Sequence, residues 1–153
     1  MVDEIETKGG TAVANGSDVS TPEGGEEIVA AALDAFGQID AIVANAGIIR
    51  YAELPEIDVT NVQDHFDVHL LGTFNVVRAA WPRFVEQGFG RIVTTTSAGI
   101  FGLGPNLSYA VAKSGTIGLT RNLAIVGAEH GIKANLIAPN AWTRMAGQSG
   151  TSG

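Results

Sequence analysis

The chain has 153 residues, of which 45% are hydrophobic, so it can form one domain with a real core and is not expected to be disordered. Its formal net charge of −7, with no basic stripe, argues against a nucleic-acid partner, and its lack of cysteine excludes disulfides and thiol catalysis. No apolar run is long enough to span a membrane, and the acidic start is unlike a signal peptide. We therefore expect a cytoplasmic protein.

The first half of the chain predicts a strand, a helix and a second strand. Residues 11–14 are apolar and β-prone, and are expected to form the first strand. A helix is predicted over 22–36, because Thr21 is a typical N-cap and Gly37 a typical terminator. The short apolar run 41–45 is predicted to be the second strand.

The second half continues the alternation. A long helical stretch is predicted over 59–86, with a kink or break at Pro82, because proline lacks the N–H that the helix needs. Residues 91–96 are expected to form a strand, 107–129 a helix and 132–138 a last strand. This order predicts an α/β fold, a partial doubly wound parallel sheet with flanking helices, and right-handed crossovers are expected to place helices on both sides.

Tyr109 and Lys113 are four residues apart on the predicted helix 107–129, so their side chains lie on the same face. A positive charge beside a phenol favours the phenolate, which would make Tyr109 a general acid or base for carbonyl chemistry. The same spacing also arises by chance on exposed helices. The helix starts from the rim where the strands are expected to end, which is where ligands bind in such sheets.

Five short motifs accompany this pair in order: Asp18-Val19, Asn45-Ala46-Gly47, Thr96-Ser97, Tyr109-x-x-x-Lys113 and Ala138-Pro139. Together they resemble the short-chain dehydrogenase/reductase family, which has a Rossmann-like fold and uses NAD or NADP. The stretches 68–72 and 78–82 look like the branch with (3R)-hydroxyacyl-CoA dehydrogenases. The resemblance implies an oxidoreductase that interconverts a secondary alcohol and a ketone by hydride transfer, with 3-hydroxyacyl-CoA-like compounds among the candidate substrates.

The resemblance also implies roles for single residues. Tyr109 would give its proton to the substrate oxygen, and Lys113 would bind the nicotinamide ribose. A hydroxyl before them would orient the substrate: Thr96 lies thirteen residues ahead of Tyr109, the usual family spacing, and Ser97 twelve. We favour Ser97, because a primary hydroxyl rotates more freely, although either could merely close a backbone hydrogen bond.

Cofactor contacts are implied at Asp18, Val19, Asn45, Ala46, Gly47, Tyr109, Lys113 and Pro139. The residues alone allow simpler readings, in which Asp18 is a solvated turn residue, Asn45 braces two strand ends and Gly47 turns the chain. His69 takes the place of a relay asparagine in many relatives and could conduct protons. His65 lies four residues before it, but without a third ligand we predict no metal site.

Both ends depart from the resemblance. No G-x-x-x-G-x-G or G-x-G-x-x-G turn is present, so residues 1–145 are expected to be an incomplete, apparently truncated NAD(P)-binding domain, and 146–153 a flexible tail. The open edge along 41–44 predicts a rearranged N-terminal segment, strong self-association or poor stability, and cofactor binding should be weak. The alternatives to a homo-oligomeric enzyme are an inactive fragment that serves as an oligomerisation module, and an unrelated α/β binding domain.

Overall fold

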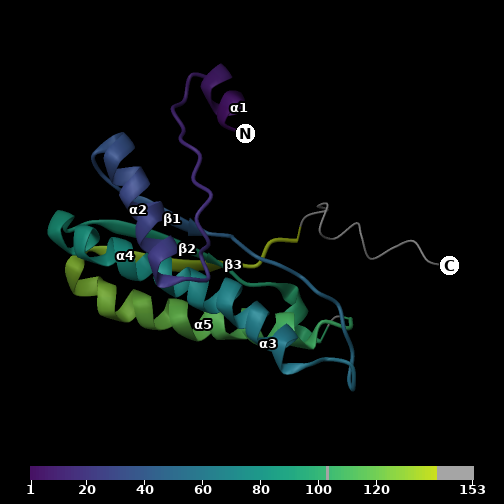
Figure 1. Ribbon diagram of the computed structural model, residues 1–153. Coiled ribbons are helices and arrows are strands. Elements are labelled where there is room, and N and C mark those ends of the chain that lie inside the picture. The colour runs from purple at the N-terminus through teal and green to yellow at the C-terminus, as the bar shows by residue number, and fades with distance from the viewer. Residues whose placement is uncertain (103, 141–153) are drawn as a thin grey trace.

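A computed structural model describes residues 1–102 and 104–140, so the predicted tail 146–153 lies outside the described residues. Strands β1 (Ala41–Ala44), β2 (Gly90–Thr95) and β3 (Ile132–Ile137) form one parallel sheet in the order β1-β2-β3 (Figure 1). The main helices are α1 (Val2–Thr7), α2 (Pro22–Phe36), α3 (Val59–Phe66), α4 (Gly72–Gln87) and α5 (Leu107–Gly127). The α/β architecture with a parallel sheet is confirmed.

Local signals set the helix ends where the sequence predicted them. Thr21 Oγ1 accepts a hydrogen bond from the Gly24 N–H at 3.0 Å and caps α2. Gly37 ends α2 in the left-handed conformation, with φ of 74°, which glycine adopts at little cost. Asp58 caps α3 in the same way, with Oδ1 2.7 Å from the Asn61 nitrogen.

The predicted break at Pro82 is not found, because α4 runs through this residue. The interruption lies earlier, where a π-helical turn over Asp67–Leu71 separates α3 from α4. Packing of α4 against α2 and the sheet supports the helix, so tertiary contacts outweigh the missing proline N–H. Wider turns of this kind occur often at functional sites, and this one carries His69.

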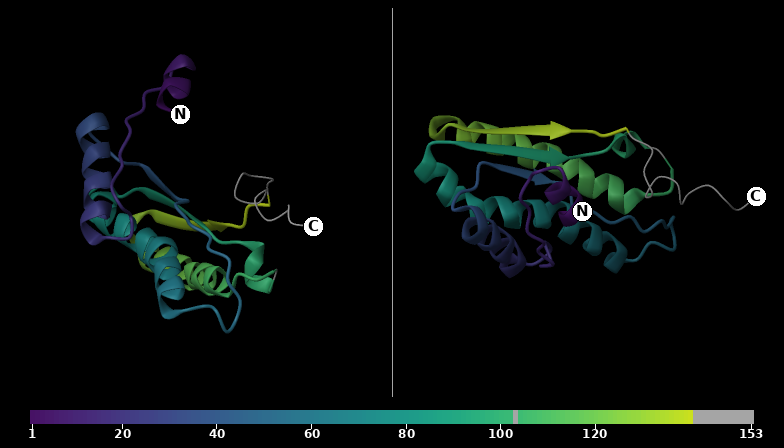
Figure 2. Two further views of the ribbon diagram at one scale, coloured as in Figure 1. Left: turned by 45° about the vertical axis from the view of Figure 1, so that its right-hand side comes forward. Right: turned by 90° about the horizontal axis from the view of Figure 1, so that it is seen from above.

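The expectation of helices on both sides is wrong for the described residues. Both α4 and α5 cover the same face of the sheet, as the two views in Figure 2 show. Right-handed crossovers between successive neighbours, in the order β1-β2-β3, always pass on the same side. Ile42 and Ile92 face the helices and are 6% and 0% exposed, whereas Val43 points the other way and is 64% exposed.

The strand predicted over 11–14 is also wrong. Among residues 1–102 and 104–140 this segment pairs with no strand. It links α1 to α2, and α1 buries none of its residues and stands away from the sheet (Figure 1). A strand needs a neighbour to satisfy its N–H and C=O groups. Within the described residues β1 pairs with β2 alone, so it has the open edge that the sequence predicted.

The core lies between the sheet and its helices, and Phe84 is its largest fully buried side chain. Gly90 begins β2 against that ring: a Cβ atom at Gly90 would lie 2.5 Å from Phe84 Cγ. We expect Gly90→Ala to lower the free energy of unfolding by about 1–3 kcal/mol, as overpacking does elsewhere. Urea denaturation would measure this, with Gly16→Ala as control, because a Cβ there meets nothing within 4 Å. Equal stability of the two variants would contradict the prediction.

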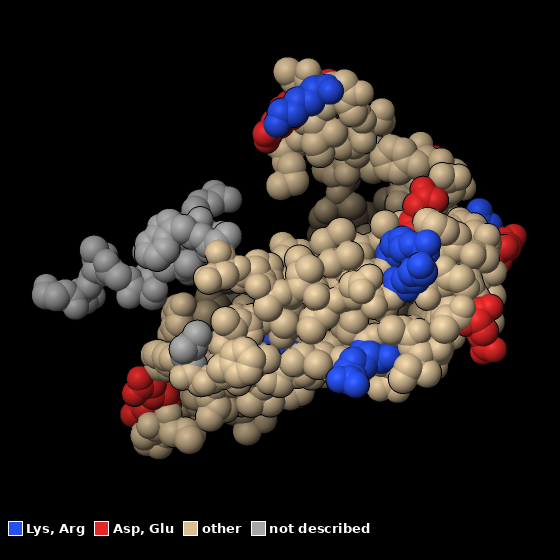
Figure 3. Space-filling view, turned by 180° about the vertical axis from the view of Figure 1, so that it is seen from behind, with Lys and Arg blue, Asp and Glu red and all other residues tan. Residues whose placement is uncertain are grey.

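Basic side chains are dispersed over the face of the molecule drawn in Figure 3. There, Lys and Arg side chains lie in separate groups, some of them beside Asp or Glu, and form no continuous stripe. Within the described part of the chain, no helix has the length and apolar character needed to cross a membrane.

Candidate functional site

The residues that follow the strands meet at the carboxyl edge of the sheet. Thr95 Oγ1, at the end of β2, donates to Asn45 Oδ1, just after β1, at 3.3 Å. The Thr96 N–H donates to the Ile137 carbonyl at the end of β3, at 2.8 Å. Asn45 therefore braces two strand ends, and the predicted rim exists.

Tyr109 and Lys113 stand at this rim on the first turns of α5. Lys113 is 4% exposed, and its Nζ donates to the Thr95 carbonyl at 2.9 Å. The same Nζ lies 5.7 Å from the centre of the half-buried Tyr109 ring. The structure thus brings a phenol and an ammonium together at the end of β2, as the spacing predicted.

Burial changes the charge balance at the site. Loss of solvent around the ammonium lowers the pKa of Lys113 from 10.5 to about 8. The group is still a cation at neutral pH, but it is held in the folded protein at a cost in free energy.

The Thr94 and Thr96 hydroxyls link the end of β2 to α5, whereas the Thr116 hydroxyl bonds within α5. The sequence analysis missed these threonines and Thr120 as a set. The Lys113 carbonyl accepts from Thr96 Oγ1 at 2.9 Å and from Thr116 Oγ1 at 2.7 Å. Further along, Thr94 Oγ1 and Thr120 Oγ1 share a hydrogen bond of 2.6 Å. The sequence does contain the pattern: Thr94 and Thr96 are two residues apart, which places them on one face of a strand, and Thr116 and Thr120 are four apart, which places them on one face of a helix.

The two candidate hydroxyls occupy different surroundings. Thr96 is buried under α5, with its hydroxyl bonded to the Lys113 carbonyl. Ser97 Oγ accepts from the Gly99 N–H at 3.1 Å and is partly exposed. A Cβ built on Gly99 would lie 3.4 Å from Ser97 Oγ and 3.6 Å from Tyr109 Cε1, so these two side chains border the same small space.

The rings of His65 and His69 stack with their centres 5.9 Å apart, and each meets the Tyr109 ring edge-on. Both His65 nitrogens are engaged by backbone, Nδ1 with the Asn61 carbonyl at 2.7 Å and Nε2 with the Arg50 N–H at 3.2 Å. Neither nitrogen is therefore free to bind a metal. Across residues 1–102 and 104–140, no group of three or more His, Cys, Asp or Glu side chains is placed to hold a metal ion.

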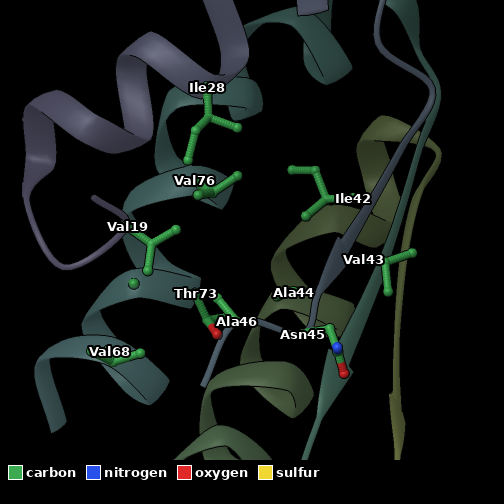
Figure 4. Close-up of a pocket in the computed structure, with 11 residues that line it drawn as sticks. Val19, Ile28, Ile42, Val43, Ala44, Asn45, Ala46, Val68, Thr73 and Val76 are labelled. Atoms are coloured by element: carbon green, nitrogen blue, oxygen red, sulfur yellow. The ribbon is translucent and has the colours of Figure 1, made fainter. Parts of the chain in front are cut away.

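An apolar pocket of about 130 Å³ opens beside the end of β1, between α2 and α4 (Figure 4). Ile42 points into it from the strand, facing Ile28 and Val76. Of the predicted cofactor residues, three line it: Val19, Asn45 and Ala46.

Asp18 and Pro139 lie outside this pocket. The Asp18 side chain is exposed, and Oδ1 accepts from the Ser20 N–H at 2.9 Å, which lowers the pKa of this carboxyl. This geometry matches the turn residue of the simpler reading. Pro139 is exposed and lies two residues beyond β3, at the carboxyl edge.

Comparisons with known proteins identify the family of this chain. A family model for short chain dehydrogenase matches residues 1–151. A short-chain type dehydrogenase/reductase of Mycobacterium tuberculosis is 45% identical over 146 residues, covering 95% of this chain and 51% of that protein. The peroxisomal multifunctional enzyme type 2 of Mus musculus is 47% identical over 146 residues, covering 95% of this chain and 20% of that enzyme.

A solved structure of a dehydrogenase has a similar fold. The NAD+-bound xylitol dehydrogenase superposes with a TM-score of 0.84 at 28% identity, over 90% of this chain and 54% of that one. The chain thus spans about half the length of that structure and of the mycobacterial relative. The family match, the parallel sheet and the tyrosine–lysine pair at its carboxyl edge agree, and the chain belongs to the short-chain dehydrogenase family.

Proposed function

We propose that this chain carries the reaction centre of an NAD(P)-dependent oxidoreductase that interconverts a secondary alcohol and a ketone. The observation that carries the proposal is the juxtaposition of the Tyr109 ring and the buried Lys113 ammonium at the end of β2. A phenol beside a cation can give a proton to a ketone oxygen or take one from an alcohol.

In this proposal each group has one task. Tyr109 exchanges the proton with the substrate oxygen, and Lys113 supports the negative charge that the phenol carries afterwards. The Ser97 hydroxyl, which shares the small space beside Tyr109 Cε1, donates a hydrogen bond that orients the same substrate oxygen. A nicotinamide cofactor, when bound, would accept or supply the hydride.

The residues at the carboxyl edge fit such a cofactor. The apolar pocket lined by Val19 and Ala46 suits the flat, weakly polar adenine, with Asn45 at its rim. Lys113 Nζ offers donors for ribose hydroxyls. We propose Asp18, the neighbour of Val19, as an outer contact to adenine, and Pro139, two residues beyond β3, as an outer contact to nicotinamide. The NAD+-bound relative supports nicotinamide use, and we propose NAD or NADP without choosing between them.

For the substrate we propose a 3-hydroxyacyl-CoA-like compound. Support comes from the relatives' names: the mouse peroxisomal multifunctional enzyme type 2, and a peroxisomal hydratase-dehydrogenase-epimerase of Saccharomyces cerevisiae. A 3-hydroxyacyl thioester contains the secondary alcohol that the tyrosine–lysine pair would oxidise.

The second candidate is a catalytically inactive module for oligomerisation. The observation that favours it is the open edge of β1 next to a sheet face on which Val43 is 64% exposed. Parallel sheets are usually covered on both faces, so this surface would be buried in a homo-oligomer.

The two candidates separate in a direct assay. The enzyme proposal expects the purified chain to form NADH or NADPH from a 3-hydroxyacyl-CoA or a simple secondary alcohol, and to bind reduced cofactor by fluorescence. A chain that binds no cofactor and reduces none, yet sediments as a concentration-independent oligomer, would support the module instead. Sedimentation and turnover are therefore measured on the same sample.

The hydroxyl assignment predicts unequal effects of two substitutions. Ser97→Ala should lower kcat/KM by about 10²- to 10³-fold, because the substrate oxygen loses a donor. Thr96→Val should mainly lower the free energy of unfolding, by about 1 kcal/mol, since it removes the bond to the Lys113 carbonyl. Steady-state kinetics and urea denaturation of both variants check this. A larger kinetic loss in Thr96→Val would transfer the role to Thr96.

A further inference from the structure

His69 touches both a backbone loop and the candidate catalytic tyrosine. It lies in the π-helical turn Asp67–Leu71 and is 2% exposed. Its Nε2 is 2.7 Å from the Ile48 carbonyl oxygen, in the loop after β1. Its ring centre is 5.1 Å from that of Tyr109, with the two planes at 89°. One side chain thus bridges the loop and Tyr109.

Gly47 shows how closely the loop approaches this ring. A Cβ atom at Gly47 would lie 2.6 Å from His69 Cε1 and 3.1 Å from His69 Nδ1. The φ of Gly47 is outside the left-handed range, so the backbone alone does not require glycine there. The close approach of the imidazole is what excludes a side chain.

The surroundings of His69 favour a neutral imidazole. His69 Nε2 lies 2.7 Å from the Ile48 carbonyl oxygen and 3.3 Å from the Ile48 nitrogen, so one backbone residue offers it both an acceptor and a donor. A neutral ring with its proton on Nε2 satisfies the shorter of these two contacts. Within residues 1–102 and 104–140, the buried Nδ1 has no hydrogen-bond partner. The titratable groups that face it are Lys113 and Tyr109 from α5 and His65 from α3, while the loop offers backbone alone. Burial, and then the charge of Lys113, lower the pKa of His69 from 6.5 to about 4.

We propose that His69 is a positioning residue, whose neutral imidazole acts as a clamp between the Gly47–Ile48 backbone and the Tyr109 ring and holds the phenol in place. Its catalytic consequence rests on the proposed function. The clamp differs from a proton relay, because a relay through this ring would pass through an imidazolium. In the part of the chain that the structure describes, no acidic side chain faces the ring to stabilise one.

A double-mutant cycle tests the contact without any assay of activity. Gly47→Ala is expected to lower Tm by about 5 °C, because the new methyl group displaces the imidazole. In a His69→Ala background the same substitution should change Tm by less than about 1 °C. Gly118→Ala, where a Cβ meets nothing within 4 Å, is the control and should act equally in both backgrounds. Equal losses from Gly47→Ala in both backgrounds would overturn the clamp.

The effect on Tyr109 needs a second readout, which a purely structural role would not move. By NMR, the ring signals of Tyr109, assigned with Tyr109→Phe, should shift as the pH falls from 6.5 toward 4 and His69 gains a proton. That titration should disappear in His69→Asn, the more conservative substitution, which is used in case His69→Ala does not fold. It should persist in the control variant His130→Asn. If the Tyr109 signals ignore the titration, His69 does not position the phenol.

The two proposals can fail separately. If the chain binds no reduced cofactor but the cycle and the titration behave as expected, the clamp stands and the proposed function falls. If cofactor binds with the same pH dependence in the native chain and in His69→Asn, the clamp has no role in the reaction.

Discussion

Tyr109→Phe is expected to lower the rate of nicotinamide-dependent alcohol oxidation by about 10²- to 10⁴-fold, the usual contribution of a positioned acid–base group. The phenylalanine ring keeps the edge-on contact with His69 and loses the oxygen alone. The free energy of unfolding should therefore change by less than about 1 kcal/mol. Cofactor affinity should change little, because Lys113 and the pocket remain.

The chain offers a matched control for this prediction. It contains two tyrosines, and the other, Tyr51, is 46% exposed in the segment between β1 and α3. Tyr51→Phe removes the same atom and should leave kcat within about 2-fold of the native value. Measuring kcat and KM for both variants with one substrate isolates the chemical role. Unchanged kcat in Tyr109→Phe would remove the basis of the enzyme proposal.

The sequence predicted those parts of the fold that local chemistry decides. Thr21 and Gly37 define the ends of α2 through groups within one turn of each end, so the predicted and observed bounds agree. The segment 11–14 was misread because a β-prone run becomes a strand only when another strand pairs with it. The placement of helices depends on strand order, which periodicity within one element does not contain.

The same distinction between local and long-range contacts applies to the candidate site. Tyr109 and Lys113 are one helical turn apart, so a single element places them together and sequence spacing predicts the contact. The Lys113–Thr95 bond and the Gly47–His69 approach join different elements, and they become visible only when the sheet is assembled. The sequence could name Gly47 and His69 as candidates, but no sequence pattern predicted that their atoms would pack so closely.

Lys113→Met is expected to make the protein more stable at pH 7 while removing its proposed activity. The native lysine is 4% exposed, and its pKa falls from 10.5 to about 8 through burial, which corresponds to roughly 3 kcal/mol against the charged form. Methionine keeps most of the apolar stem and has no charge to bury. It forfeits the charged hydrogen bond to the Thr95 carbonyl, worth about 1.5–3 kcal/mol, so a net gain of up to about 1.5 kcal/mol is expected.

The pH dependence separates this explanation from a general packing effect. Between pH 8 and 10.5 the unfolded chain binds more protons than the folded one, because the pKa of Lys113 is lower in the folded state. The stability of the native protein therefore rises across this window, and the advantage of Lys113→Met shrinks with increasing pH. Denaturant titrations at several pH values test this, with the exposed Lys133→Met as control. A Lys113→Met variant less stable than the native protein at pH 7 would mean that the buried ammonium stabilises the fold, and that the site carries no stability penalty for its chemistry.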